Sequence, residues 1–529
     1  MLTQHTLFEE PQSYADAIAS PHCNNWIDAM HTEHDSLVSN QVWKLVSRPT
    51  NANVVKCKWV YKLKHDADGK FDRFKARLVA RGFTQKQGID YNETFSPVVR
   101  HSSMRILFSL ANEMDLEIDH LDVETAFLNG NLNEVIYMEQ PEGFRSKNDN
   151  RVCLLQKSIY GLKQASKMWN VKVNSVLVDN GFKQSLCEPC IYTKRSHNDF
   201  VIVALYVDDF YVFYSKNSSV KIQLLNVLEK EFNVKNLGPL KNCLGMRVTR
   251  DRSKGTLCLD QTEYIKKLLR RFNMQDCKPI ATPMALNSKL TLAKVESACI
   301  LDETYNYRQL IGSLMYLSVC TRPDITFACS QLSQFNNSFD SSHWIAAKRI
   351  LRYLAGTINY SLCYVKSVNL DIRAYTDADW GNDENDRKSF TGFVIKLGNN
   401  TINWESRKQR SIALSSTEAE YLAIGDVCKD VCFIKNLLSE IVHKEVPCTV
   451  FNDNQSAHKL LECKEFCHKR TKHIDIRYHF VKDLIKNDSI SVKYLSTDKM
   501  IADVLTKPLC VQKHCSFIEN MSLKMTVST

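Results

Sequence analysis

Two adjacent carboxylates, Asp208 and Asp209, interrupt a run of apolar and aromatic residues over 200–214. Apolar runs of this kind predict a pair of strands, with the polar dipeptide at the turn between them. Neighbouring residues on a strand face opposite ways, so adjacent acids share a direction only where the chain turns. Such a turn could hold a divalent cation such as Mg²⁺, which prefers oxygen ligands. Taken alone, the dipeptide is more typical of a solvated acidic turn, because Asp is common in turns.

A third acid, Asp122, ends an alternating strand 86 residues before Asp208. A helix-like pattern follows it, so Asp122 could also serve as a helix N-cap. Nucleotide polymerisation by two metals needs ions about 4 Å apart, held by carboxylates. A strand-end Asp beside a two-Asp hairpin could supply such a centre. Spacing alone leaves both interpretations open.

A second group of acids lies in the last third of the chain. Asp377 ends an alternating strand, Glu418 opens a long amphipathic helix, Asp453 follows another strand, and Asp503 lies near the end. Acids at strand ends and helix starts suit a second two-metal centre, for hydrolysis of a phosphodiester. Ser415 and Glu418 also form a capping-box pattern, which explains Glu418 without a metal.

Length and composition limit the class of protein. A chain of 529 residues is too long for one ordinary core and indicates about three or four domains. A hydrophobic content of 44% with 24% charged residues matches a globular protein. No apolar run reaches the roughly 18 residues that span a membrane, and the N-terminus lacks a secretory pattern. We therefore expect neither a membrane protein nor a secreted one.

The net charge of +10 is concentrated in one segment. Ten Lys or Arg and three Asp lie from Lys56 to Lys86, which together supply +7. A basic strip of this kind indicates a phosphate-bearing partner, although a solvated basic face would give the same pattern. Period-two alternation puts Lys75, Arg77 and Arg81 on one strand face, with apolar residues on the other.

The elements expected at the N-terminal end are a helix and a hairpin. The first forty residues predict a helix with Trp26, Met30 and Leu37 on one side. Residues 55–80 predict a two-stranded hairpin that carries the basic strip. A basic face backed by an apolar one is a plausible finger for gripping phosphate.

Cysteine usage bears on the compartment. Nineteen cysteines are scattered along the chain without a regular framework. In a chain of this size, that pattern predicts reduced thiols in a cytoplasmic setting.

Several sequence blocks together point to a known family. They are KWVYK at 58–62, KARLVARG at 75–82, ETFSPV at 93–98, LDVETAFL at 121–128, YGLKQA at 160–165 and YVDD at 206–209. In their number and order they closely resemble the polymerase region of copia-type LTR retrotransposons, whereas any one block would be only suggestive. The resemblance runs from about residue 10 to residue 509.

The resemblance implies an α+β fold: a right-hand polymerase with fingers, palm and thumb, a helical connection, and an RNase H-like α/β domain with a mixed sheet. The expected segments are a lead-in from the integrase–polymerase linker over 1–40, reverse transcriptase over 41–284, linker and connection over 285–368, RNase H over 369–510 and a C-terminal tail over 511–529. The sequence carries no protease or integrase pattern. We therefore expect a polyprotein fragment, a truncated copy or a stand-alone product.

By the same resemblance, Asp122, Asp208 and Asp209 are the catalytic and metal-binding acids of a reverse transcriptase. Phe127 lies where the family places the ring that excludes a ribose 2′-hydroxyl, although it could also be a core aromatic. The other nucleotide-binding candidates are Lys75, Arg77, Gln164 and Tyr206. Which of the two cations contacts the triphosphate is left open.

The resemblance extends to an RNase H centre. Its implied catalytic and metal-binding acids are Asp377, Glu418, Asp453 and Asp503. The neighbours Glu420 and Asp379 receive no definite role. Some RNase H enzymes carry a catalytic His in the loop before the last acid, but residues 496–499 here contain none. Hydrolysis would therefore proceed without this histidine, on the four implied metal ligands.

The implied function is RNA-directed DNA synthesis, followed by hydrolysis of the RNA in the hybrid. The implied cofactor is Mg²⁺ or Mn²⁺, two ions at each centre. The implied partners are an RNA template, a DNA primer, the RNA/DNA hybrid and dNTPs, without a membrane. We expect the protein in the cytoplasm, including virus-like particles, or in the nucleus. The alternative is a catalytically inactive or domesticated remnant that binds nucleic acid.

Overall fold

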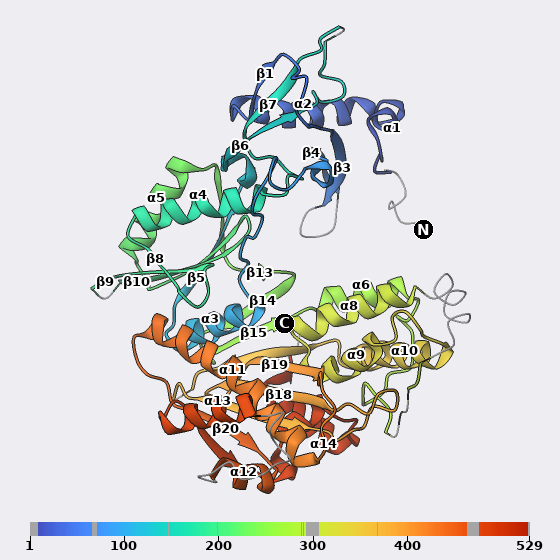
Figure 1. The fold of residues 1–529 in the computed structure, drawn as a ribbon, viewed down its shortest axis with the longest axis vertical. Helices are drawn as coiled ribbons and strands as arrows, with labels where there is room; N and C mark the ends of the chain where they lie inside the picture. The colour runs from blue at the N-terminus through green and yellow to red at the C-terminus, as the bar shows by residue number, and fades with distance from the viewer. Residues whose placement is uncertain are drawn as a thin grey trace. The chain divides into compact units, whose positions relative to one another are not determined.

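Helices and sheets are mixed throughout the protein (Figure 1). The computed structural model describes residues 9–65, 71–146, 148–197, 199–286, 288, 290–292, 306–367, 369–462 and 475–526. The chain forms two compact units, of which one is Met1–Val99, Asp119–Gln184 and Pro189–Gly238, and the other is Arg100–Ile118, Ser185–Glu188 and Pro239–Thr529. The fold is α+β, as predicted. The units interleave in sequence, which the expected contiguous segments did not anticipate.

The described residues of the first unit form three sheets. Its helices are α1 Tyr14–Ala19, α2 Cys23–Ser39, α4 Ala165–Asp179 and α5 Ser219–Glu231, with 3₁₀ turns η1 Gly82–Thr84 and η2 Ala126–Asn129. Its strands are β1 Trp43–Val46, β2 Val54–Val55, β3 Cys57–His65, β4 Phe71–Ala80, β5 Glu117–Val123, β6 Asn131–Met138, β7 Val152–Lys157, β8 Lys183–Gln184, β9 Ile191–Ser196, β10 Asp199–Tyr206, β11 Asp209–Tyr214 and β12 Val234–Pro239. The sheet orders are β1-β7-β6-β2, β3-β4 and β12-β5-β11-β10-β9-β8.

The predicted N-terminal helix and hairpin are confirmed. Helix α2 buries Trp26, Met30 and Leu37, as its spacing indicated. These side chains belong to one core cluster with the apolar face of β3 and β4, including Leu78. The rings of Trp26 and Tyr61 meet edge to face, with centroids 5.2 Å apart. The helix thus supports the β3–β4 hairpin from its apolar side.

The hairpin of β10 and β11 lies inside the six-stranded sheet. Strand β10 is buried from Phe200 to Leu205, and the register pairs Tyr206 with Asp209. The turn therefore consists of Val207 and Asp208, and Asp209 is the first residue of β11. The two predicted strands are confirmed, with only one of the two acids inside the turn.

The second unit combines helices with two further sheets. Its helices are α3 His101–Glu113, α6 Thr262–Arg271, α8 Tyr307–Cys320, α9 Thr326–Ser333, α10 Ser341–Gly356, α11 Ser416–Val442, α12 Gln455–Glu462, α13 Asp475–Lys486 and α14 Val511–Asn520, with 3₁₀ turns η3 Pro323–Ile325, η5 Thr497–Lys499 and η6 Ile501–Leu505. Its strands are β13 Asn242–Cys243, β14 Met246–Asp251, β15 Thr256–Asp260, β16 Tyr360–Val365, β17 Ile372–Ala378, β18 Phe390–Leu397, β19 Asn400–Lys408, β20 Cys448–Asn452, β21 Ser491–Tyr494 and β22 Leu523–Met525.

One of these sheets has the mixed topology predicted for an RNase H-like domain. Its order is β19-β18-β17-β20-β21. Strands β17, β18 and β19 are antiparallel neighbours, whereas β20 is parallel to β17 and β21 is parallel to β20. Helix α11 buries the apolar residues spaced by three and four, which are Tyr421, Ile424, Cys428, Val431, Ile434, Leu438 and Ile441. The helix is therefore amphipathic, as the sequence predicted.

The other sheet includes strands from two of the expected segments, the connection over 285–368 and the C-terminal tail over 511–529. Its order is β13-β14-β15-β16-β22, so β16 belongs with strands that come about a hundred residues earlier. The end of the expected helical connection is therefore a strand. The expected C-terminal tail forms α14 and β22, and β22 pairs with β16. The buried His514 Nε2 lies 3.2 Å from the Tyr353 hydroxyl oxygen, which anchors α14 to α10.

One pair of cysteines departs from the prediction of reduced thiols. Cys258 in β15 and Cys363 in β16 lie directly opposite each other and form a disulfide. Their Cα atoms are 4.1 Å apart. The cysteines are far apart in sequence, and only the pairing of β15 with β16 brings them together.

Within the described part of the chain, no helix combines the length and the apolar character that a bilayer crossing requires.

Candidate active sites

The three predicted acids of the first unit lie near one another at one end of the six-stranded sheet, although their oxygens are not all within 4.8 Å of one another. Asp122 lies near the end of β5, and Asp208 lies in the turn between β10 and β11. The Val123 amide donates to the Asp208 carbonyl oxygen over 3.0 Å, so the two segments are joined next to the acids. Burial raises the pKa of both Asp122 and Asp208, and the charge of Asp209 raises each further. Carboxylates that raise one another's pKa form a site that favours bound cations.

The turn that carries Asp208 is held in a strained conformation. Val207 has φ of +57°, which a β-branched residue rarely adopts. The Trp169 indole, on the buried face of α4, donates from Nε1 to the Val207 carbonyl oxygen over 2.5 Å. Strained backbone persists where surrounding contacts determine it, and it clusters at functional sites. Trp169 therefore fixes the turn, a role that the sequence did not indicate.

His120 is a second residue that sequence reasoning missed. Its Nε2 lies 2.6 Å from the Asp209 Oδ1, and its ring stacks on Tyr211 with centroids 5.0 Å apart. His120 comes two residues before Asp122 on β5, so the two side chains share a face of the strand. The two-residue spacing between His120 and Asp122 could therefore have identified His120 from the sequence. The histidine orients Asp209 beside the other acids.

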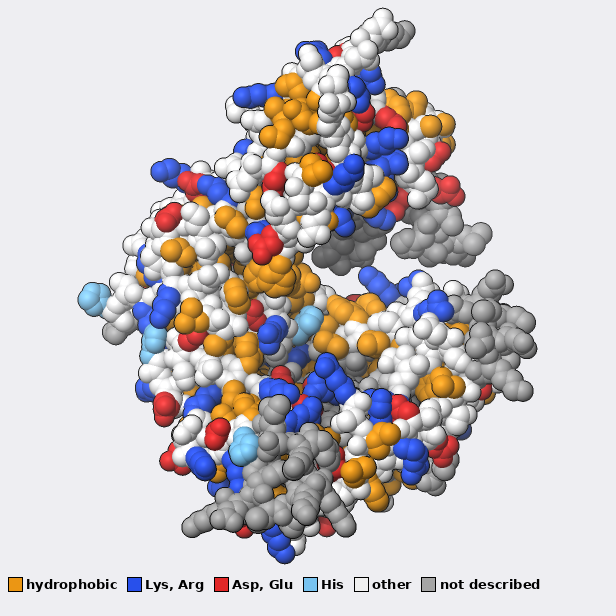
Figure 2. Space-filling model, in the orientation of Figure 1, with side chains coloured by type: hydrophobic (Ala, Val, Ile, Leu, Met, Phe, Trp, Pro, Cys, Tyr) orange, Lys and Arg blue, Asp and Glu red, His pale blue; other side chains and the backbone are white. Residues whose placement is uncertain are grey.

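The predicted cations Lys75 and Arg77 lie within electrostatic reach of these acids. The charge of Lys75 lowers the pKa of Asp122, and the charge of Arg77 lowers that of Asp208, although burial dominates in both. The Arg77 guanidinium lies 4.2 Å from the centroid of the Tyr160 ring. Blue Lys and Arg side chains gather over the β3–β4 hairpin in Figure 2. The basic residues that the sequence concentrates in this segment therefore lie together on the surface of this unit.

The remaining nucleotide-binding candidates have different surroundings. Half-buried Phe127, in η2, meets the Tyr160 ring edge to face at 5.0 Å. Tyr206 is half-buried at the end of β10, directly before the turn.

The surroundings of Gln164 do not favour the predicted contact with a nucleotide. Its side chain is 0% exposed. The Gln164 amide donates over 2.8 Å to the Asp90 carbonyl oxygen and accepts from Gln85 over 3.1 Å. These partners use its polar atoms, so Gln164 has a structural role here, at the start of α4.

In the second unit, a cluster of three acids comes from three different elements. They are Asp377 on β17, Glu420 on α11 and Asp453, the residue after β20. One oxygen of each lies within 4.8 Å of the other two. Burial raises the pKa of Asp377 to about 6, and burial together with the Asp377 charge raises the pKa of Glu420 well above its usual range. An all-carboxylate set with this mutual repulsion fits a hard divalent cation such as Mg²⁺ or Mn²⁺.

The structure puts Glu420 in this cluster, where the sequence predicted Glu418. Glu418 instead closes the start of α11: its amide donates to the Ser415 Oγ over 3.2 Å, and its Oε2 accepts from the Leu414 amide over 2.9 Å. Residues two apart on a helix are about 200° apart around its axis. Glu420 therefore faces the sheet, where the Asn452 amide donates to its Oε2 over 2.9 Å. The role of Glu418 at the helix start was visible in the sequence as a capping pattern with Ser415.

Asp503 lies next to the cluster but is held by lysines. It is 0% exposed, in η6. Its Oδ1 is 2.9 Å from the Lys507 Nζ, and its Oδ2 is 2.7 Å from the Lys513 Nζ. The Lys507 Nζ is also 3.5 Å from the Asp377 Oδ2, which accepts a hydrogen bond from the Thr506 hydroxyl. Asp503 is therefore linked to the cluster through Lys507.

Asp379 shares the end of β17 with Asp377, and burial raises the pKa of Asp379 to about 7. The charge of Asp377 raises it further, and the Phe390 amide donates to its carboxylate. We expect Asp379→Asn to stabilise the protein at pH 8 by about 2 kcal/mol, because the variant has no buried charge.

The sign of this effect follows from the two states of Asp379. Its pKa in the folded protein exceeds the ordinary value of 3.8, so its ionisation costs folding free energy. The advantage of Asp379→Asn should therefore grow from about pH 4 to pH 7 and stay constant above. Urea unfolding in EDTA at four pH values would measure it. An advantage that does not change with pH would contradict the assignment.

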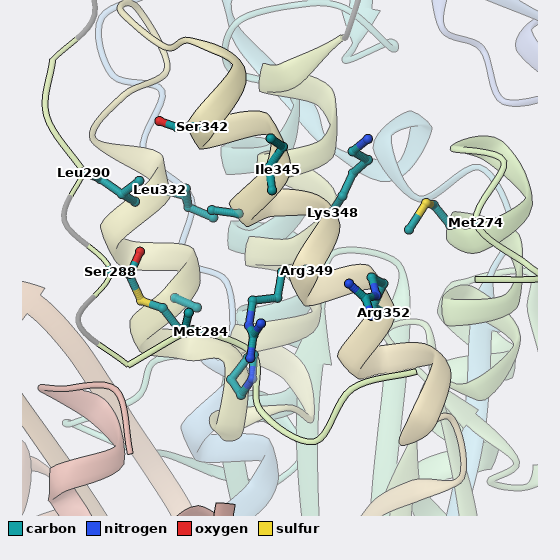
Figure 3. Close-up of a pocket in the computed structure, with 14 residues that line it drawn as sticks. Met274, Met284, Ser288, Leu290, Leu332, Ser342, Ile345, Lys348, Arg349 and Arg352 are labelled. Carbon is teal, nitrogen blue, oxygen red and sulfur yellow. The ribbon is translucent and has the colours of Figure 1, made fainter. Parts of the chain in front are cut away.

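A separate cavity of about 600 Å³ lies among the helices of the second unit (Figure 3). Apolar side chains such as Met284, Leu332 and Ile345 line it, together with Arg349 and Arg352 of α10. The described residues that line it include none of the predicted site residues. The candidate catalytic residues are thus the two sets of acids, and none of these acids lines this cavity.

The chain is similar to known proteins over most of its length. Residues 40–286 match the family model described as reverse transcriptase (RNA-dependent DNA polymerase). The retrovirus-related Pol polyprotein from transposon TNT 1-94 of Nicotiana tabacum is 43% identical over 505 residues, which is 94% of this chain. The chain spans 38% of the length of that relative.

Two further matches differ in extent. A protein assigned to transposon Ty5-1 in Saccharomyces cerevisiae is 32% identical over 313 residues, which cover 59% of this chain and 100% of that protein. Among solved structures, the foamy viral protease-reverse transcriptase in complex with an RNA/DNA hybrid aligns with 89% of this chain and 53% of its own, at 12% identity and a TM-score of 0.46.

Proposed function

Because this chain belongs to the reverse transcriptase family of copia-type Pol polyproteins, we propose that it copies RNA into DNA and degrades the RNA of the resulting hybrid. The first unit would carry the polymerase centre. The five-stranded mixed sheet and α11 would carry the ribonuclease H centre. The substrates proposed are an RNA template, a DNA primer, dNTPs and the RNA/DNA hybrid.

The observation that carries the polymerase proposal is the convergence of Asp122 with Asp208 and Asp209. Hydrogen bonding between the β5 end and the turn joins acids that are far apart in sequence. Carboxylates at this position would hold two divalent cations, Mg²⁺ or Mn²⁺, which supply activation of the primer hydroxyl and stabilisation of the leaving pyrophosphate. His120 and Trp169 would keep the acids in place.

Other residues of the first unit would receive the nucleotide. Lys75 and Arg77 carry positive charge near the acids and would bind the triphosphate. Phe127 would lie beneath the sugar and exclude a ribose 2′-hydroxyl by its bulk. Tyr206, next to the turn, would contact the primer end or the nucleotide. The surroundings of Gln164 support a structural role only.

The three-acid cluster supports the ribonuclease H proposal. Asp377, Glu420 and Asp453 offer oxygens close enough to share a divalent cation, which would activate water for in-line hydrolysis. Glu420 takes the place that sequence reasoning gave to Glu418. Asp503 completes the acidic surroundings, next to Asp377.

Purified protein should extend an oligo(dT) primer on poly(rA) with dTTP and Mg²⁺ or Mn²⁺, and should cleave a labelled RNA/DNA hybrid. Both reactions should stop in EDTA. The family membership and the intact acid sets support both activities. Folded protein that binds the hybrid in a salt-dependent way, but catalyses neither reaction, would identify a nucleic-acid-binding remnant instead.

A further inference from the structure

Each carboxylate oxygen of Asp503 forms an ion pair with a different lysine ammonium group. The Lys507 Nζ lies 2.9 Å from the Asp503 Oδ1, and the Lys513 Nζ lies 2.7 Å from the Asp503 Oδ2. The Lys507 Nζ also lies 3.5 Å from the Asp377 Oδ2. One ammonium group is therefore shared between two buried acids.

The chain itself holds Lys507 in this position. Lys507 follows Asp503 by four residues, and its amide donates to the Asp503 carbonyl oxygen over 3.1 Å. The side chains of Asp377 and Asp503 are 3% and 0% exposed, so their charges are poorly solvated. Two such charges need a compensating cation. The Thr506 hydroxyl donates to the same oxygen of Asp377.

Among the described residues, Glu420 and Asp453 form no ion pair with either lysine, although the charge of Lys507 acts on both. Asp377, Glu420 and Asp453 form the group whose oxygens lie within 4.8 Å of one another, and Asp503 is not a member. A cation among these three would not compete with Lys507 for space on Asp503. Asp377 thus belongs to two groups: it offers an oxygen to a cation together with Glu420 and Asp453, and it shares the Lys507 ammonium group with Asp503.

We propose that the Lys507 ammonium group takes the place of a second divalent cation between Asp377 and Asp503. The centre then holds a single divalent cation, among Asp377, Glu420 and Asp453, when no nucleic acid is bound. This inference deepens the proposed ribonuclease H function and rests on it for the identity of the site. Lys507 is a positioning residue that sets how many ions the acids accept.

The test counts bound Mn²⁺ by electron paramagnetic resonance, in the full chain without nucleic acid. All proteins would carry Asp122→Asn with Asp208→Asn, so that ions at the first acid set do not contribute. Adding Glu420→Gln should remove one bound ion from the parent. Lys507→Met should instead bind one ion more than the parent. Lys429→Met is the matched control, because Lys429 pairs with the Asp426 Oδ1 over 3.1 Å and should leave the count unchanged.

If adding Glu420→Gln removes two bound ions from the parent, the proposal is wrong, whatever the Lys507 variants show. If folded Lys507→Met binds the same number of ions as the parent, the proposal is also wrong. If Lys507→Met does not fold, Lys507→Gln is measured in its place. Hybrid cleavage by the unmodified chain is measured separately. If one Glu420-dependent ion binds but no hybrid is cleaved, the ribonuclease function fails while the ion count stands. If the hybrid is cleaved and two such ions bind, only the inference about Lys507 fails.

Discussion

Asp208→Asn is expected to reduce primer extension on poly(rA)·oligo(dT) by at least about a thousandfold. The asparagine keeps the shape of the side chain but removes the charge that would hold a divalent cation. The turn itself should persist, because Trp169 holds the backbone at Val207 rather than at residue 208. Burial raises the pKa of Asp208, so the neutral side chain is also compatible with folding. Steady-state extension rates would measure the loss.

The matched control for this loss is Asp179→Asn. Asp179 is an exposed acid at the end of α4 in the same unit, so the change in net charge is identical. Its extension rate should stay within about twofold of the parent, since isolated surface changes have small effects. Asp208→Asn should still cleave the hybrid, because that centre lies in the other unit. Extension by Asp208→Asn at the parent rate would refute the polymerase assignment.

The second large effect is expected from Glu420→Gln, with a loss of at least about a hundredfold in hybrid cleavage. Glu418→Gln should change cleavage by less than about threefold, because that side chain serves the helix start. The two variants should also differ in stability. Glu420→Gln should raise the unfolding free energy at pH 8, since burial penalises the ionised Glu420. Glu418→Gln should lower it by about 0.5–1 kcal/mol.

The two glutamates therefore serve as controls for each other. Both substitutions remove one negative charge from the first turns of α11. Cleavage rates and urea unfolding curves on the same preparations separate a role in catalysis from a role in capping. If Glu418→Gln lost cleavage and Glu420→Gln kept it, the assignment from the sequence would be right and the geometric one wrong.

The sequence was most informative where local periodicity decided the structure. The helix that buries Trp26, Met30 and Leu37, and the hairpin around Asp208, both follow from spacing within a few turns or strand residues. The mixed sheet and the buried face of α11 were also predicted correctly. For the helices and the hairpin, the pattern of apolar residues specifies which side must leave water. The mixed sheet was instead implied by the family resemblance.

Site residues were harder to predict where one pattern had two explanations. Glu418 and Glu420 both lie at the start of α11, and only the direction of the sheet separates them. Gln164 lies within a block that carries the family resemblance, yet its neighbours in space enclose it. Trp169 donates to the Val207 carbonyl oxygen beside the acids, and the sequence showed it only as a core aromatic. His120 contacts Asp209, and only its spacing from Asp122 could have indicated it.

By itself, the sequence determined the family, the two acid sets and most of the elements that carry them, because these depend on residue type and short-range spacing. Only the tertiary structure decided which acids meet. It grouped Glu420 with Asp377 and Asp453, and it put Lys507 between Asp377 and Asp503. It also paired β22 with β16 and interleaved the two units. These outcomes depend on contacts between residues far apart in the chain, and no local pattern encodes the direction from which a distant side chain arrives.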